Sequence, residues 1–337
     1  MAITYLVGAK PGLYDRGVAS TMATVSTWSY ADVTSFAEVM SRRGFAGGEA
    51  VSINLQNDAL LVGTTAYLLQ DANQQVVILS FRGTEPGSGI NWLGNVSAKP
   101  EPFHVLGKVH GGFYRPLLAM WNVILDLLDK AMDGKSSLCI AAKRLMEQYV
   151  CKEGSDSPGV VGGPPTEDSR KPLLYITGHS LGGALAVLAA ARIFTEHRLY
   201  EAYWKDRLRG IYTFGQPMVG DKEFATRFED VFKGTLFRHV YENDVFPRLP
   251  PRTVGNFWHI GEEYVSTKSG WAYQSQGLTQ AHTFVGSTLL GIIAFVTDQL
   301  AGMRIAEWIP WPYSVEAHSP LNYLRVSQMA HPATALL

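Results

Sequence analysis

The sequence predicts an α/β fold with a mostly parallel central sheet flanked by helices, built as a single domain over residues 1–337. Strand-like and helix-like periodicities alternate along the chain, which is typical of this class. With 46% hydrophobic and 18% charged residues, the composition is that of a globular protein that can bury a large core. No internal repeat is visible, so repeat architectures are not favoured.

Three strands are expected first, and two helices follow them. The strand patterns cover Ala50–Leu55, Gly63–Gln70 and Gln75–Phe81, and the helical patterns cover Pro116–Met132 and Leu138–Val150. Residues 151–172 then combine Gly, Pro, Ser and charge, which predicts a flexible surface loop.

Strands and helices alternate after that loop. The expected strands are Leu173–Thr177, Gly210–Phe214, Leu236–Glu242 and Trp258–Val265, and the expected helices are Leu181–His197 and Lys222–Phe232. Because the alternation continues across the loop, we expect one continuous sheet rather than two domains.

A serine lies where the strand at 173–177 turns into an Ala-rich helix. The segment reads GHSLGG, in which Gly178 and Gly182 flank Ser180. Such a corner strains the backbone of the serine and points its Oγ out of the fold, while the helix N-terminus offers N–H groups to an oxyanion. Ser180 is therefore a candidate nucleophile, and its alternative role is a helix N-cap.

A serine nucleophile needs a histidine base and an acid that orients it. In the chain order of serine, acid and histidine, His318 is favoured because it lies in a polar turn after the segment IPWPY, and His282 is the second choice. Asp244 directly follows the strand at 236–242, where such folds place site residues. Asp221 is better explained as a helix cap.

An oxyanion also needs hydrogen-bond donors. The residue after the nucleophile, Leu181, supplies one N–H group. A loop after an early strand normally supplies the second, and here Thr84 in the segment FRGT can donate both its N–H and its hydroxyl. Arg82 in the same segment is interpreted as structural.

Seven sequence blocks occur in a fixed order along the chain. They are FRGT (81–84), NW (91–92), VHGGF (109–113), GHSLGGALA (178–186), TFGQPMVGD (213–221), NDVFPRLPP (243–251) and HSPLNYL (318–324). Together they resemble the class 3 (fungal-type) triacylglycerol lipases. The resemblance implies an α/β-hydrolase-like fold, with Ser180 as nucleophile, His318 as general base and acid, and Asp244 as the residue that orients the histidine.

The same resemblance implies that Thr84 and Leu181 form the oxyanion hole, and it treats His179 as a packing residue without chemistry. It also implies a lid at residues 85–103. We expect the apolar residues Ile90, Trp92 and Leu93 to cover the site in water and to turn toward lipid at an oil–water interface. The alternative is an ordinary surface loop with a buried tryptophan.

These residues predict a lipase that hydrolyses the carboxylic ester bonds of acylglycerols through an acyl-enzyme, with no cofactor and no metal. The chain has no HExxH motif, dinucleotide fingerprint or P-loop. A phospholipase A1 and a short-chain or aromatic carboxylesterase are alternatives, because the same triad serves all of them. A catalytically inactive lipase-like binding module is an alternative of another class.

Charge and targeting signals say little about partners. The formal net charge of −1 and a pI of about 6.8 give no electrostatic attraction to nucleic acid, so we expect lipid contact to be apolar and transient. The apolar run Thr283–Val296 is shorter than a spanning helix. Without a secretory signal, we expect a cytoplasmic, trimmed or otherwise exported protein. Cys139 and Cys151 leave one bridge or two free thiols open.

Overall fold

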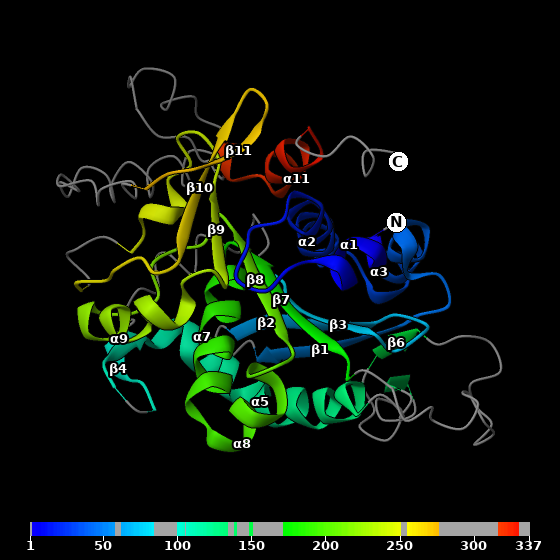
Figure 1. The fold of residues 1–337 in the computed structure, drawn as a ribbon. Coiled ribbons are helices and arrows are strands. Elements are labelled where there is room, and N and C mark those ends of the chain that lie inside the picture. Colours follow the sequence, from blue (N-terminus) through cyan, green and yellow to red (C-terminus); the bar gives the residue numbers. More distant parts are fainter. Residues whose placement is uncertain are drawn as a thin grey trace.

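The computed structural model describes residues 2–57, 62–83, 100–104, 106–133, 138–139, 148–150, 171–250, 255–275 and 316–329. The strands in these ranges are β1 (Glu49–Asn57), β2 (Val62–Gln70), β3 (Val76–Phe81), β4 (Pro100–Pro102), β5 (Lys108–His110), β6 (Gln148–Val150), β7 (Leu173–His179), β8 (Leu208–Phe214), β9 (Leu236–Val240), β10 (Glu262–Thr267) and β11 (Gly270–Tyr273). β4 and β5 form a separate antiparallel pair, and the other nine strands form one sheet in the order β11-β10-β9-β8-β7-β3-β2-β1-β6 (Figure 1).

The centre of this sheet is parallel. β3, β7, β8, β9 and β10 pair in parallel, whereas β11 at one edge and β2, β1 and β6 at the other pair antiparallel. All six residues of β3 are buried, as expected for a central strand that is covered on both faces. The structure thus confirms the predicted α/β class with its mostly parallel central sheet.

Helices cover both faces of the sheet (Figure 1). One hydrophobic core lies under α5 (Gly111–Met132), α7 (Leu181–Thr195) and α9 (Lys222–Phe232). The second core lies under α1 (Ala2–Gly8), α2 (Arg16–Trp28), α3 (Val33–Met40) and α11 (Pro320–Met329). The shorter helical segments are the π-helical turns η1 (Ser41–Phe45) and η3 (Tyr200–Trp204), the helical turn α8 (His197–Leu199), and the 3-10 turns η4 (Phe246–Arg248) and η6 (Glu316–His318).

The N-terminal helices were not expected from the sequence. α2 begins after Asp15, whose carboxylate accepts the N–H of Val18 at 2.9 Å, and α3 begins after Asp32, which caps its first turn in the same way. Residues 17–26 of α2 are all buried. α2 packs on β7 and on α11, so this N-terminal segment covers part of one face of the central sheet.

Three expected elements differ from the structure. The helix expected at 138–150 is wrong at its end, because residues 148–150 form β6 and pair antiparallel with β1; a short apolar run is ambiguous by periodicity alone. The strand expected at 258–265 begins only at Glu262, since Gly261 has a φ of +87° that interrupts extended backbone. α5 begins at Gly111, before the expected Pro116, because Phe113 adds a turn by packing into the core.

Some predictions fall on residues outside the described ranges. Residues 84–99, which make up most of the predicted lid, and residues 151–170 of the predicted loop are among them. At the end of the lid range, residues 100–102 form β4, and Phe103 is buried in the core. Cys139 is disulfide-bonded, so it is not one of the two free thiols that the sequence also allowed. Cys151 lies outside the described residues.

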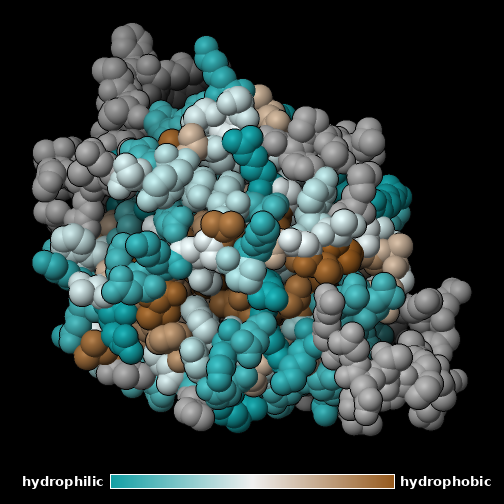
Figure 2. Space-filling view, in the orientation of Figure 1, coloured by the Kyte–Doolittle hydropathy of each residue, from teal (hydrophilic) through white to brown (hydrophobic). Residues whose placement is uncertain are grey.

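The described surface is mixed in character. Figure 2 shows hydrophobic residues as separate patches among hydrophilic ones on the face that it presents. Of the helices in the described ranges, none is both long and apolar enough to cross a membrane.

Candidate active site

Ser180 occupies a strained corner between β7 and α7. Its φ of 59° and ψ of −129° lie outside the regions that a non-glycine residue ordinarily adopts. A Cβ at Gly182 would lie 2.0 Å from the carbonyl oxygen of Phe81, so only glycine allows the helix to approach β3 this closely. Ser180 stands at the N-cap position of α7, but its side chain makes no capping hydrogen bond. The hydroxyl is therefore available to another partner.

That partner is His318. Its Nε2 lies 2.7 Å from Ser180 Oγ, and its Nδ1 lies 2.7 Å from Asp244 Oδ2. The three residues are far apart in sequence and come from the β7–α7 corner, the loop after β9 and the turn η6. The structure thus brings together the three residues that the sequence singled out for nucleophile, base and acid. Ser180 and Asp244 are buried, and the side chain of His318 is 11% exposed.

The carboxylate of Asp244 is fully supplied with donors although it is buried. Oδ1 accepts the N–H of Phe246 at 2.9 Å, and Oδ2 accepts a short hydrogen bond from the hydroxyl of Tyr323 besides facing His318. A buried carboxylate needs such partners, because an unpaired one costs several kcal/mol. Sequence reasoning missed Tyr323, although it belongs to the block HSPLNYL.

The imidazole of His318 is held on two sides. The ring of Phe246 stacks on it with centroids 3.6 Å apart and an interplanar angle of 12°. On its other side lies Gly215, with a φ of +59°, where a Cβ would be 2.8 Å from His318 Cε1 and 3.1 Å from Asp244 Oδ2. Sequence reasoning also missed Gly215, although it stands in the block TFGQPMVGD.

The expected oxyanion donors are described only in part. Leu181 is the first residue of α7, and the first N–H groups of a helix have no partner within the helix. Gly83 lies beside the serine, since a Cβ there would be 3.1 Å from Ser180 Cβ. The loop after β3 therefore reaches the corner, but Thr84 itself lies outside the described residues, as do Ile90, Trp92 and Leu93 of the predicted lid.

Four histidines, of which His110, His179 and His239 are buried and His259 is partly exposed, have pKa values that favour the neutral form. Burial lowers the pKa of His110 to about 4 and that of His239 to about 3, and it lowers the pKa of His179 and His259 well below the usual 6.5. At His179 the neighbouring His318 acts in the same direction. The ring centroid of His179 lies 4.6 Å from that of His318, so His179, which the sequence predicts to be a packing residue, contacts the proposed base.

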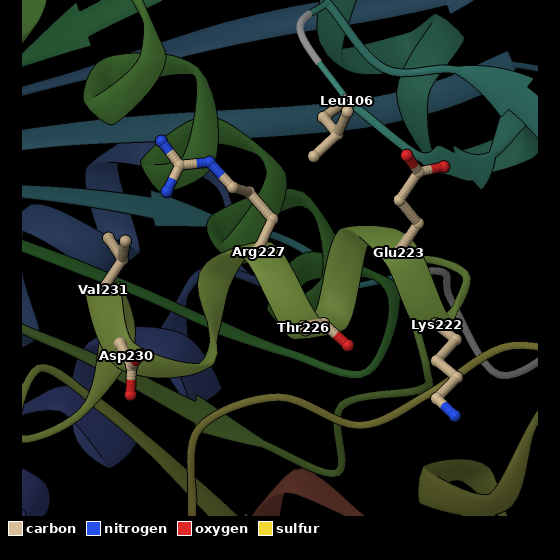
Figure 3. A pocket seen from close by; sticks show the side chains of 7 residues that line it. All are labelled: Leu106, Lys222, Glu223, Thr226, Arg227, Asp230 and Val231. Carbon is tan, nitrogen blue, oxygen red and sulfur yellow. The ribbon is translucent and has the colours of Figure 1, made fainter.

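Other features of the described residues do not offer a second reaction centre. No group of three or more His, Cys, Asp or Glu residues within the described ranges is arranged to hold a metal ion. A groove of about 700 Å³ runs along the outer side of α9, where Figure 3 shows the side chains that line it: Leu106, Lys222, Glu223, Thr226, Arg227, Asp230 and Val231. None of them belongs to the Ser180 site.

Comparisons with known proteins find similarity to lipases. Residues 166–254 match the family described as lipase (class 3), which confirms the resemblance inferred from the sequence blocks. The triacylglycerol lipase OBL1 of Arabidopsis thaliana is 30% identical over 185 residues, covering 54% of this chain and 35% of that protein. A lipase of Rhizomucor miehei is 29% identical over 208 residues, covering 61% of this chain and 46% of that protein. The match thus spans less than half the length of these relatives.

Solved structures show the fold. A deletion mutant of the Rhizomucor miehei lipase in its propeptide complex superposes with a TM-score of 0.56 at 22% identity, covering 92% of this chain and 79% of that one. A fungal lipase–inhibitor complex gives a TM-score of 0.54 at 20% identity, covering 91% and 95% of the two chains. This likeness, together with the parallel sheet and its flanking helices, makes the fold α/β-hydrolase-like.

Proposed function

We propose that this chain, which resembles the class 3 lipases over residues 166–254, hydrolyses the carboxylic ester bonds of acylglycerols. One observation carries the proposal: His318 lies 2.7 Å from Ser180 Oγ on one side and 2.7 Å from Asp244 Oδ2 on the other. A serine, a histidine and a buried acid at these distances are what nucleophilic catalysis of acyl transfer requires.

The proposed reaction has two halves. Ser180 Oγ attacks the ester carbonyl while His318 Nε2 takes its proton, and Asp244 stabilises the resulting imidazolium through Nδ1–H. The alcohol then leaves with the proton from His318 Nε2, and the acyl group stays on the serine. Water enters, gives its proton to the histidine, and releases the acid from Ser180 by the reverse sequence of transfers.

The negative charge on the tetrahedral intermediate also needs donors. We assign this role to the N–H of Leu181, at the start of α7, and to the N–H and hydroxyl of Thr84. The described residue before Thr84, Gly83, lies beside Ser180, which supports a donor from this loop. Removal of one such donor typically costs about 10²- to 10³-fold in kcat.

An oil–water interface is the proposed place of action. The chain would meet acylglycerol at the lipid surface rather than in bulk water. Residues 85–99, with Ile90, Trp92 and Leu93, would act as the lid, since residues 100–102 form β4 and Phe103 is buried in the core. The fungal lipase–inhibitor complex was described as a model for interfacial activation, and that property is carried to this chain as a proposal. Replacing Trp92 and Leu93 by Ser should lower the rate on emulsified triolein and leave hydrolysis of a dissolved short ester within about twofold.

The deciding experiment is a rate series on p-nitrophenyl esters from acetate to palmitate and on emulsified triolein. Ser180→Ala should lose at least about 10⁴-fold in kcat on every substrate, and Ser269→Ala, in an exposed turn, should behave as the parent. Labelling by a fluorophosphonate probe should likewise depend on Ser180. Equal hydrolysis by the parent protein and Ser180→Ala would sink the assignment of the nucleophile.

The substrate range of the same series separates the related activities. Hydrolysis of palmitate esters and triolein supports a lipase, whereas activity confined to short dissolved esters indicates a carboxylesterase. Release of fatty acid from phospholipid but not from triolein indicates a phospholipase. If neither hydrolysis nor labelling occurs, the chain is a binding module with a lipase fold.

A further inference from the structure

The hydroxyl of Tyr30 lies between the two segments that flank the proposed oxyanion site. Its oxygen is 2.8 Å from Nδ1 of His179, the residue before Ser180. The same oxygen packs against the backbone of Gly83, the residue before Thr84, since a Cβ on that glycine would lie 2.1 Å from it. The Tyr30 hydroxyl thus contacts both segments: on one it lies one residue before Thr84, and on the other it lies one residue before the nucleophile Ser180.

The sheet alone does not hold these two segments together. β3 and β7 are parallel neighbours, and their last registered pair is Phe81 with Gly178. Beyond that pair, the N–H of Arg82 still donates to the carbonyl of Thr65 on β2, and Gly83 lies against the carbonyl of His179, where β3 and β7 are no longer paired. The Tyr30 hydroxyl is placed just past the end of the ladder, where it can fix the spacing that strand pairing no longer fixes.

The protonation states of the pair are defined by burial. Burial raises the pKa of Tyr30 far above its usual value, against the opposing effects of Arg82 and of the Gly83 N–H, so the phenol keeps its proton. His179 is 2% exposed, and burial together with His318 keeps it neutral. A neutral phenol and a neutral imidazole thus share the 2.8 Å hydrogen bond between the Tyr30 hydroxyl and Nδ1 of His179.

The other end of this contact reaches the proposed base. The ring of His179 lies against that of His318, with centroids 4.6 Å apart and a tilt of 35°. The position of the His179 ring therefore affects Ser180, to which it is joined by the backbone, and His318, against which it packs. Tyr30 reaches this arrangement from the turn after α2, a part of the chain outside the family match at 166–254.

We propose that Tyr30 is a positioning residue that sets the distance between the Gly83 backbone and the Ser180–Leu181 corner, and with it the alignment of the proposed oxyanion donors. The inference rests on the proposed function, because it concerns donors that act on the tetrahedral intermediate. A displacement of about 1 Å in such a site is enough to cost about 10²-fold in rate.

The test is Tyr30→Phe, which removes only the hydroxyl, compared with Tyr67→Phe. Tyr67 is the matched control, because its hydroxyl donates to the carbonyl of Ala31, next to Tyr30 in sequence, at 2.6 Å. Tyr30→Phe should lower kcat on p-nitrophenyl butyrate by about 10- to 100-fold with KM within twofold. The affinity for a trifluoromethyl ketone, which forms an oxyanion on the serine, should fall by the same factor.

A purely structural role would predict another pattern. If Tyr30 were only structural, the melting temperature of both variants would fall by the same amount, and Tyr30→Phe would have the same kcat and ketone affinity as Tyr67→Phe. If Tyr30→Phe keeps kcat within twofold of the active parent, the proposal is wrong while the proposed function stands.

If the parent protein shows no ester hydrolysis, hydrogen exchange still tells failure of the Tyr30 proposal apart from failure of the proposed function. Backbone amides in peptides that contain Arg82 and Gly83 should exchange at least tenfold faster in Tyr30→Phe than in the parent or in Tyr67→Phe. Unchanged exchange in these peptides overturns the positioning role whatever the activity of the parent. Faster exchange in Tyr30→Phe, together with an inactive parent, supports the positioning role of Tyr30 and contradicts the proposed function.

Discussion

The hydroxyl of Tyr323 donates to Oδ2 of Asp244, the same carboxylate oxygen that lies 2.7 Å from His318 Nδ1. Burial, followed by the charge of Asp244, raises the pKa of Tyr323 well above its usual value, so the phenol keeps the proton that it donates to the carboxylate. The carboxylate therefore shares its charge between a fixed phenol and the imidazole.

Loss of that phenol should weaken both stability and turnover. In Tyr323→Phe the buried carboxylate loses one donor, and a hydrogen bond to a charged group contributes about 1.5–3 kcal/mol. We expect the free energy of unfolding in urea to fall by about this amount and kcat to fall as the orientation of Asp244 loosens. Unchanged values of both quantities would show that the contact has no energetic role.

Replacing Asp244 itself should mainly affect chemistry. Asp244→Asn keeps the shape of the side chain but favours the wrong tautomer of His318, so we expect kcat to fall by about 10⁴-fold on p-nitrophenyl butyrate. Asp221→Asn is the control, because Asp221 caps α9 by accepting the N–H of Phe224 at 2.9 Å. Asn caps a helix about as well as Asp, so that control should keep both its stability, within about 0.5 kcal/mol, and its kcat. Similar kcat values for the two variants would exclude Asp244 as the orienting acid.

A methyl group at Gly215 should displace the proposed base. In Gly215→Ala the new Cβ meets His318 Cε1 at 2.8 Å and Asp244 Oδ2 at 3.1 Å, so the imidazole must move and kcat should fall by about 10²-fold. Gly12→Ala is a matched control, since Gly12 also has a positive φ, +77°, but nothing lies within 4 Å of its Cβ position. The control should lose about 1–2 kcal/mol of stability from backbone strain alone and keep kcat. Equal kcat in the two variants would contradict the steric argument.

Stability should fall between pH 6.5 and pH 5. His110, His179, His239 and His259 have folded-state pKa values below 6.5, so in this window the unfolded chain binds protons that the native chain does not. The free energy of unfolding therefore falls by up to about 1.4 kcal/mol per pH unit for each histidine as the pH drops below 6.5 toward the folded-state pKa values. Above pH 6.5 this contribution to stability is fully present. Urea midpoints at pH 5 and pH 7 test this, and equal midpoints would contradict neutral burial of these histidines.

Local sequence patterns were sufficient for the nucleophile corner and for most strands. The turn at Ser180 is set by its neighbours, because two glycines and a strand-to-helix switch lie within five residues of one another. Asp244 and His318 followed from chain order and from their positions after a strand and in a polar turn. These signals concern residues whose backbone environment is defined within a few positions of the chain.

The N-terminal helices could not be read from periodicity, for a physical reason. α2 is buried nearly all round and carries hydroxyls on its buried surface, for example Thr21 and Thr24, whose Oγ1 atoms donate to carbonyls one turn earlier at 2.9 Å. These self-satisfied polar residues remove the contrast between apolar and polar faces on which a helix prediction depends. Tyr30 follows this helix, so its approach to Gly83 and His179 depended on tertiary structure.

The same dependence explains the other residues that were missed. β6 forms only because β1 offers it an edge, and a register of three residues has no signature of its own. Gly215 and Tyr323 lie in recognised blocks, but their roles depend on which side chains come within reach when β8, the loop after β9 and α11 are packed together.

The packing of α11 on α2 gives the chain an order of assembly. The carbonyl of Pro320, two residues after His318, accepts a hydrogen bond from the hydroxyl of Thr27 at 3.3 Å, so the turn that carries the proposed base packs on a helix that is synthesised long before it. Ser180 and Asp244 leave the ribosome long before His318 does. A nascent chain would thus carry Ser180 without its proposed base until α11 docks on α2, so the arrangement of Ser180, His318 and Asp244 can form only after α11 has been synthesised.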